Sequence, residues 1–265
     1  MSAFTALARD ALRDAARRRG LVAAAVASAI AALAIERCGH CEAAVSIQGE
    51  RMSAQAGELA VIGAIASLAL VAVWTYAVAA LLASDGLAAA LEDGVVEAVL
   101  ARPVSRDVLV IARLAGAWAG AFALGAALFA LATGLAADRP GVTLAPALRA
   151  LLSAGVAAWT VAALAMCVSL SLPRAATLLL FGALGAVVVG IETAGLFGAR
   201  MGGFAGAVVA WGPAWIAAPV SALAPWLSTA HPPGPPAWPN ARALFWAAAA
   251  TCALVARFRR IELPR

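Results

Sequence analysis

The sequence predicts an all-α polytopic membrane protein with six transmembrane helices. Of its 265 residues, 64% are hydrophobic and 12% are charged, whereas soluble globular chains carry about 25% charged residues. Apolar runs close to the roughly 20 residues that a membrane-crossing helix requires recur along the chain. The polar intervals between these runs are too short to hold a soluble domain. We therefore expect residues 1–265 to form a single transmembrane domain.

An amphipathic helix is expected in residues 1–19. From Phe4 onward, apolar side chains lie on one face, and Arg9, Arg13 and Arg17 form a polar stripe on the other. This pattern is typical of a helix lying at the cytoplasmic membrane interface. Charged residues run through residues 1–20, so we expect no cleavable signal peptide.

Six apolar segments are predicted to cross the membrane. Their approximate limits are Gly20–Ile35, Leu59–Ala83, Val108–Leu135, Pro146–Leu172, Ala175–Ala194 and Ala241–Ala256. Alanine dominates these segments, which favours close helix packing through small residues. In the third segment, Gly116 and Gly120 have the GxxxG spacing, which fits either a packing seam or alanine-like filler.

Residues 196–239 are expected to be external or re-entrant. Within them, Phe204–Leu227 is apolar but contains Pro213, Pro219 and Pro225, so it is predicted to form broken helices at the outer face. Tryptophans in this stretch would serve as interfacial anchors, namely Trp211, Trp215 and Trp226.

The arginines set the expected orientation. The 19 basic residues of the chain are all arginines, and most fall on the side of the two termini. The positive-inside rule then places both termini in the cytoplasm, with the chain in the cell inner membrane. Because the arginines flank apolar segments, the net charge of +5 indicates the bilayer as a partner and not nucleic acid.

The polar interval at residues 84–107 is expected to be a cytoplasmic loop with its own helix. Apolar side chains repeat every four residues at Leu87, Leu91, Val95 and Val99, which predicts an amphipathic helix over Leu87–Arg102. Gly94 would lie mid-helix, at a cost of about 1 kcal/mol relative to alanine.

Charged and capping residues add detail to this loop. Asp93 and Glu97 repel each other at i,i+4, which suits a helix shaped to meet a partner, although a helix lying on the bilayer surface is an equal alternative. Pro103 ends the helix, and Ser105 can cap the next one, with Asp107 in its first turn.

The stretch LEDGVVEAVLARPVSRDVLVIARLAG resembles the signature of ABC type-2 transporter permeases. The matching positions are an acid, a glycine, a second acid, a short apolar run and a Pro-hydrophobic-Ser-Arg turn: Glu92, Gly94, Glu97, Val99, Leu100, Pro103, Ser105 and Arg106. Val95 and Arg113 stand where that family often has threonine and lysine. The basic N-terminus, the spans and the closing FRRIEL extend the resemblance over nearly the whole chain.

The resemblance implies the permease subunit of an ABC transporter, most simply an exporter, that pairs with a second copy or a homologue. Cytoplasmic ABC ATP-binding subunits, which hold ATP and Mg²⁺, would dock on Leu91, Glu92, Asp93, Gly94, Glu97, Leu100, Pro103, Ser105 and Arg106. A Walker A motif needs a lysine, and the chain contains none. We therefore expect a transport subunit, not an enzyme, with no catalytic residue and no cofactor of its own.

Cys38, His40 and Cys41 form the tetrapeptide CGHC on the expected outer side. A Cys38–Cys41 disulfide, or a plain thiol pair, is the favoured interpretation. With His40 the pair could instead bind a soft metal such as Cu(I) or Zn. The tetrapeptide also resembles the active site of disulfide isomerases, without the strand and helix that surround it there.

Two other functions remain open from the sequence. A membrane thiol oxidoreductase would use Cys38 and Cys41 with a quinone, but no second external thiol pair is visible. A secondary transporter would need buried ionisable groups, and Glu192 is the one candidate, which we place at the bilayer edge. Cys167 and Cys252 fall within spans and are expected to be core filler.

Overall fold

Long helices make up most of the described structure, in agreement with the composition. In this computed structural model the described residues are 3–17, 26, 30, 46–47, 50–51, 56–92, 94, 96, 99, 104–137, 142–173, 176–177, 179–184, 187, 216, 218–223, 226 and 239–260.

The elements follow one another along the chain as mostly long helices. In order they are α1 (Ala3–Arg17), β1 (Ser46–Ile47), β2 (Glu50–Arg51), α3 (Ala56–Glu92), α5 (Arg106–Leu135), α6 (Leu144–Ser169), α9 (Ala218–Ala222) and α10 (Pro239–Arg259). The two short strands pair antiparallel, with Ser46 opposite Arg51 and Ile47 opposite Glu50. The rest of the described elements are helical, as expected for an all-α protein.

Within the described residues, four helices are long and apolar enough to cross a membrane. These segments are Gly63–Leu87, Arg106–Leu135, Leu144–Ser169 and Ala241–Arg259. They match the expected second, third, fourth and sixth spans. Of the expected first span, Gly20–Ile35, only residues 26 and 30 are described. In the expected fifth span, Ala175–Ala194, the described residues are 176–177, 179–184 and 187, and they are helical.

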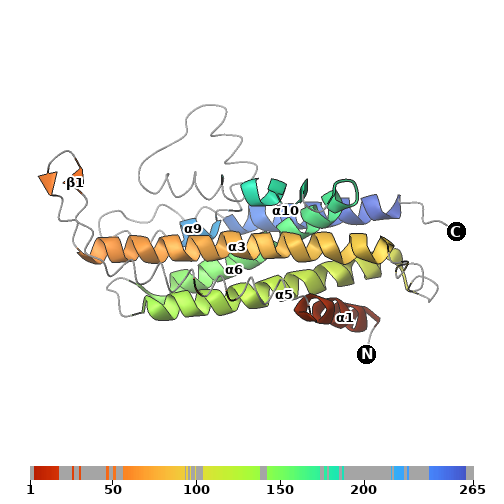
Figure 1. The fold of residues 1–265 in the computed structure, drawn as a ribbon, viewed down its shortest axis with the longest axis horizontal. Helices are drawn as coiled ribbons and strands as arrows, with labels where there is room; N and C mark the ends of the chain where they lie inside the picture. Colours follow the sequence, from red (N-terminus) through yellow and green to blue (C-terminus); the bar gives the residue numbers. More distant parts are fainter. Residues whose placement is uncertain are drawn as a thin grey trace.

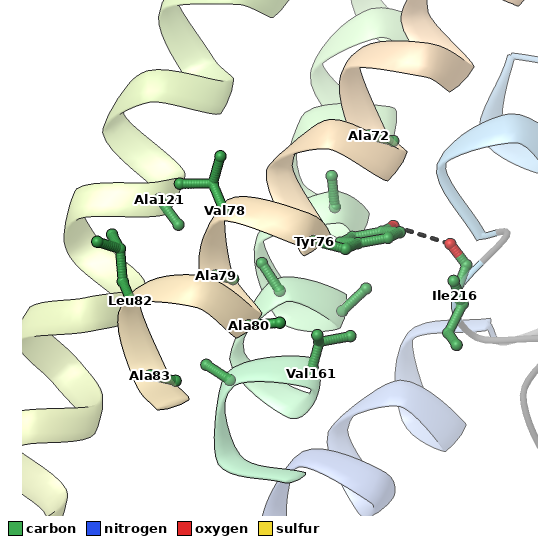
Figure 2. Packing of buried hydrophobic residues seen from close by; sticks show 14 of the residues in the cluster. Ala72, Tyr76, Val78, Ala79, Ala80, Leu82, Ala83, Ala121, Val161 and Ile216 are labelled. Atoms are coloured by element: carbon green, nitrogen blue, oxygen red, sulfur yellow. Dashed lines mark hydrogen bonds between the residues drawn. The ribbon is translucent and has the colours of Figure 1, made fainter. Parts of the chain in front are cut away.

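The helices pack through small side chains. On α3, Ala72, Ala79 and Ala83 are completely buried, and this helix packs against both α5 and α6. Figure 2 shows how side chains of α3 meet Ala121 of α5 and Val161 of α6. Because alanine lets backbones approach closely, these buried alanines allow close contacts between the helices, as predicted.

Several described residues of the segment expected at the outer face are buried against the bundle, although Ser221 is exposed. Ile216 is 2% exposed and Leu223 is fully buried. The hydroxyl of Tyr76, near the middle of α3, donates a hydrogen bond to the Ile216 carbonyl at 2.8 Å (Figure 2). Trp226 donates from Nε1 to the Thr143 carbonyl at 3.3 Å. The expectation of an interfacial anchor is not met at Trp226, because this residue is 5% exposed and its indole is bonded to the residue that precedes α6.

Different elements lie at the two ends of the helical bundle. α1, the beginning of α5 and the last turn of α10 lie at one end, and β1 lies beyond the other (Figure 1). An ion pair between Arg259 in α10 and Asp107 in α5 joins the end of α10 to the beginning of α5. Helix α1 and the last turn of α10 thus lie at the same end of the bundle (Figure 1).

Candidate functional site

The end of α3 differs from the sequence-based expectation. A separate helix was expected to begin near Leu87, but α3 runs unbroken from Ala56 to Glu92. Leu87, fully buried, and Leu91, partly buried, therefore belong to the last turns of α3. The reason is that the polar triplet at residues 84–86 contains no helix-breaking proline, and its neighbours continue the apolar face of α3.

Gly94 is the point at which the helix ends, and it does not lie mid-helix. Its φ is +68°, a left-handed conformation that glycine adopts without the steric cost paid by other residues. The Gly94 N–H donates a hydrogen bond to the Leu91 carbonyl at 3.3 Å. A Cβ at Gly94 would meet no atom within 4 Å, so it is the backbone conformation that requires glycine here, not the space around it.

The chain after Gly94 is anchored by two valines. Val96 is 2% exposed, and Val99 packs partly buried against the core. Val95 lies outside the described residues, so the four-residue stripe is described only at Leu87, Leu91 and Val99. Val96 and Val99, three residues apart, are the described apolar contacts of this connection.

The start of α5 is capped as predicted. Ser105 has extended backbone angles, and its hydroxyl accepts a hydrogen bond from the Val108 N–H at 3.3 Å. This arrangement satisfies one of the free N–H groups of the first turn. Arg106, the first residue of α5, is half-buried.

Asp107 has a second role that the sequence did not reveal. Arg259 of α10 donates from Nε to Asp107 Oδ1 at 2.8 Å and from Nη2 to Oδ2, which makes a two-point contact. The side chains are 33% exposed for Asp107 and 63% for Arg259. The pair joins the beginning of α5 to the FRR sequence at the end of α10, across 152 positions of the chain.

Several expected docking residues cannot be placed. Asp93, Glu97, Leu100 and Pro103 lie outside the described residues, and the side chain of Glu92 is not described. Four residues of the expected set are described: Leu91 lies in the last turn of α3, Gly94 follows that helix, and Ser105 and Arg106 begin α5.

Helix α1 packs against α5 at Gly116. A Cβ on Gly116 would lie 2.5 Å from the Ala11 Cβ and 2.9 Å from the Ala8 carbonyl oxygen. Of the two possibilities for the GxxxG spacing, Gly116 therefore serves a close helix contact, although its partner is the amphipathic helix. Arg9 and Arg13 remain exposed on the opposite face of α1.

A buried acid in α3 was missed. Asp85 is 5% exposed and lies within the membrane-length segment Gly63–Leu87. Asp85 is therefore a second candidate for an intramembrane acid beside Glu192, because α3 continues past Ser84. The apolar residues on both sides of Asp85, at Leu82 and Leu87, were the signal that the helix does not stop there.

A cluster of aromatic side chains joins α5, α6 and α10 and also was not predicted. Trp118 stacks on Phe122, with ring centroids 5.3 Å apart, and meets Trp159 edge-on at 5.5 Å. Trp118 donates from Nε1 to the Gly155 carbonyl at 2.8 Å. Trp159 donates from Nε1 to the Thr251 hydroxyl at 3.0 Å. Each indole thus links two helices through its only polar atom.

The cysteine sites are only partly described. Cys38, His40 and Cys41, with their possible disulfide or metal site, lie outside the described residues, as does Glu192. In the part of the chain that is described, no group of three metal-ligating side chains occurs. Cys252 is a free thiol on the exposed face of α10, and not core filler, whereas free Cys167 is half-buried.

A pocket of about 400 Å³ lies between the end of α5 and the beginning of α6. Its walls are apolar except for Thr133 and Thr143, and no charged residue lines it. It lies at the end of the bundle opposite the α3–α5 connection, and nothing in its lining selects a particular ligand.

No protein-family model matches the chain, and no curated protein matches it. In the part of the chain that the structure describes, the fold is that of a helical protein with four helices long and apolar enough to cross a membrane.

Proposed function

We propose that the chain is the permease subunit of an ABC transporter of the type-2 kind, working as an exporter with a second copy or a homologue. Separate ATP-binding subunits bind and hydrolyse ATP and contact the connection between α3 and α5. The resemblance of residues 91–116 to the family signature is the origin of this proposal.

One observation carries the proposal further. The connection leaves α3 through a left-handed glycine at Gly94 and enters α5 through the Ser105 cap. Val96 anchors it to the core between these points. A short segment with fixed ends and one buried anchor can transmit a push from a docked partner to both membrane helices. It also lies at the end of the bundle where α1 and the last turn of α10 carry their arginines (Figure 1).

Co-purification with an ATP-binding subunit tests the proposal. We expect an adjacent reading frame to encode that subunit, with a P-loop. Glu97→Arg should leave the permease inserted and folded but reduce co-purification at least about tenfold, because charge-assisted contacts at the interface become repulsive. Asp10→Arg, a charge reversal of the same size on exposed α1, is the control and should bind as the wild type does. Wild-type binding by Glu97→Arg, with transport intact, would refute the role of the connection.

Gly94 is a poor site for this test. A bulky residue such as tryptophan at φ +68° would strain the backbone even though the space is open. A loss of binding in Gly94→Trp could therefore come from a distorted connection, whereas Glu97→Arg reverses the charge and leaves Gly94 in place.

Buried Asp85 supports a second candidate, an ion-coupled secondary transporter. Ionisable groups inside membrane helices often mark ion pathways, and Asp85 lies inside the α3 segment. This candidate predicts transport in proteoliposomes driven by a proton gradient without any ATP-binding subunit, and abolished by Asp85→Asn. Transport that needs ATP and persists in Asp85→Asn would exclude it.

A further inference from the structure

The ion pair between Asp107 and Arg259 lies directly after the proposed docking segment, the connection between α3 and α5. Asp107 is the second residue of α5 and follows the Ser105 cap directly. Any displacement of the α3–α5 connection therefore reaches Asp107 within two residues. Arg259 is the last residue of α10, the helix that ends the described chain.

The ion pair between Asp107 and Arg259 fixes the relative orientation of the two side chains as well as attracting them. Both donors of Arg259 face both oxygens of Asp107, and two-point guanidinium–carboxylate contacts fix orientation better than a single bond does. The acid lies in the first turn of α5 and the arginine in the last turn of α10. Each charge thus stands at the helix end whose dipole favours it.

The same turn of α10 is also held by packing. Leu254 is fully buried and Phe258 is 1% exposed, so the end of α10 cannot swing freely about the ion pair. Further along, α10 reaches α6 through the hydrogen bond from Trp159 to Thr251. A displacement taken up at Arg259 is therefore passed along a rigid helix to a second helix of the bundle.

We propose that Asp107 and Arg259 are positioning residues that transmit movement of the α3–α5 connection to α10. The ion pair couples the docking segment to the last membrane helix, so that ATP binding by the partner displaces α5 and α10 together. The expected effect on transport rests on the proposed permease function. The mechanical coupling of α5 to α10 through the ion pair does not depend on that function.

Charge reversal provides the test. Asp107→Arg and Arg259→Asp each place two like charges face to face, and the double variant restores an opposite pair. Arg257→Asp reverses an exposed arginine in the same turn of α10 and is the matched control. The milder pair Asp107→Asn and Arg259→Gln removes the charges without introducing repulsion.

In complexes with the ATP-binding subunit, we expect the single reversals to keep wild-type co-purification but to lower transport per ATP hydrolysed about fivefold or more. The double variant should recover most of that loss, although not all, because each charge then stands at the unfavourable helix end. Arg257→Asp should behave as the wild type does. Unchanged coupling in both single reversals, or no recovery in the double variant, would overturn the proposal.

A distance measurement separates this proposal from the proposed function. Spin labels at Val104 and Arg260, in the permease alone, should give a narrow distance distribution when Asp107 and Arg259 are unchanged. The distribution should broaden in each single reversal and narrow again in the double variant. If no ATP-binding subunit co-purifies with the wild type, the proposed permease function is refuted. The distance distributions still show whether the ion pair couples α5 to α10. Equal widths in all variants would refute the link even if the function holds.

Discussion

Substituting Gly116 by alanine should detach α1 from the bundle. The added Cβ would lie 2.5 Å from the Ala11 Cβ and 2.9 Å from the Ala8 carbonyl oxygen, whereas carbon atoms in contact are normally about 3.5–4.0 Å apart. One of the opposing atoms belongs to the backbone of α1, so no rotamer change relieves the clash and the helices must separate. Overpacking of this kind costs about 1–3 kcal/mol.

Gly134→Ala in the same helix isolates that packing cost. A Cβ on Gly134 meets nothing within 4 Å, so this variant gains only the helix propensity of alanine, at most about 1 kcal/mol and less in a last turn. Gly116→Ala also gains the helix propensity of alanine relative to glycine, inside α5. The difference in unfolding free energy between the two variants therefore approximates the cost of the clash, about 1–3 kcal/mol.

Limited trypsin digestion of the protein in nanodiscs measures the effect on α1. Cleavage after Arg9 and Arg13, both exposed on α1, requires local opening of the helix. A loss of 1–3 kcal/mol corresponds to cleavage about 5 to 150 times faster. Adding Ala11→Gly to Gly116→Ala should restore part of the protection, because it removes the Cβ–Cβ contact. Equal cleavage rates in wild type, Gly116→Ala and Gly134→Ala would refute the close contact between α1 and α5.

Three further predictions follow from named contacts. Ser105→Ala removes the N-cap of α5 and should lower the unfolding free energy by about 1 kcal/mol in a denaturant titration, whereas Ser105→Asp should retain stability; equal losses in both would contradict a capping role. Trp159→Phe and Thr251→Val remove the two partners of one hydrogen bond, so a double-mutant cycle should give a coupling of about 0.5–1.5 kcal/mol, and zero coupling would show that the bond does not contribute. An impermeant thiol reagent should label cysteines at Arg260 and Val142 from opposite faces of membrane vesicles; labelling from the same face would end the topology in which α10 crosses the membrane.

Composition and hydropathy alone determined the helical membrane class of this protein. The apolar segments at Leu59–Ala83, Val108–Leu135 and Pro146–Leu172 were predicted within a few residues of the membrane-length parts of α3, α5 and α6. The Ser105 cap was predicted as well. These features are local, because they depend on the length of an apolar run or on a hydroxyl three residues from an N–H group.

The boundary between α3 and its connection was mispredicted because polarity and helix breaking are different properties. Ser84 and Asp85 looked like the start of a loop, but neither stops a helix when the turns on both sides are buried. The break came instead at Gly94, through its left-handed backbone, a conformation that a helical-periodicity argument does not detect. The same error concealed Asp85 as a buried acid.

The tertiary structure alone decided which distant residues meet. Glycine spacing suggested a close contact at Gly116, but only the packing showed that α1 is the partner. The pairing of Asp107 with Arg259 joins residues 152 positions apart, and each taken alone is an ordinary charge at a helix end. Local sequence determines which segments become helices, through propensity and hydropathy. Which faces of those helices touch depends on the packing of the whole chain at once, and no single segment carries that information.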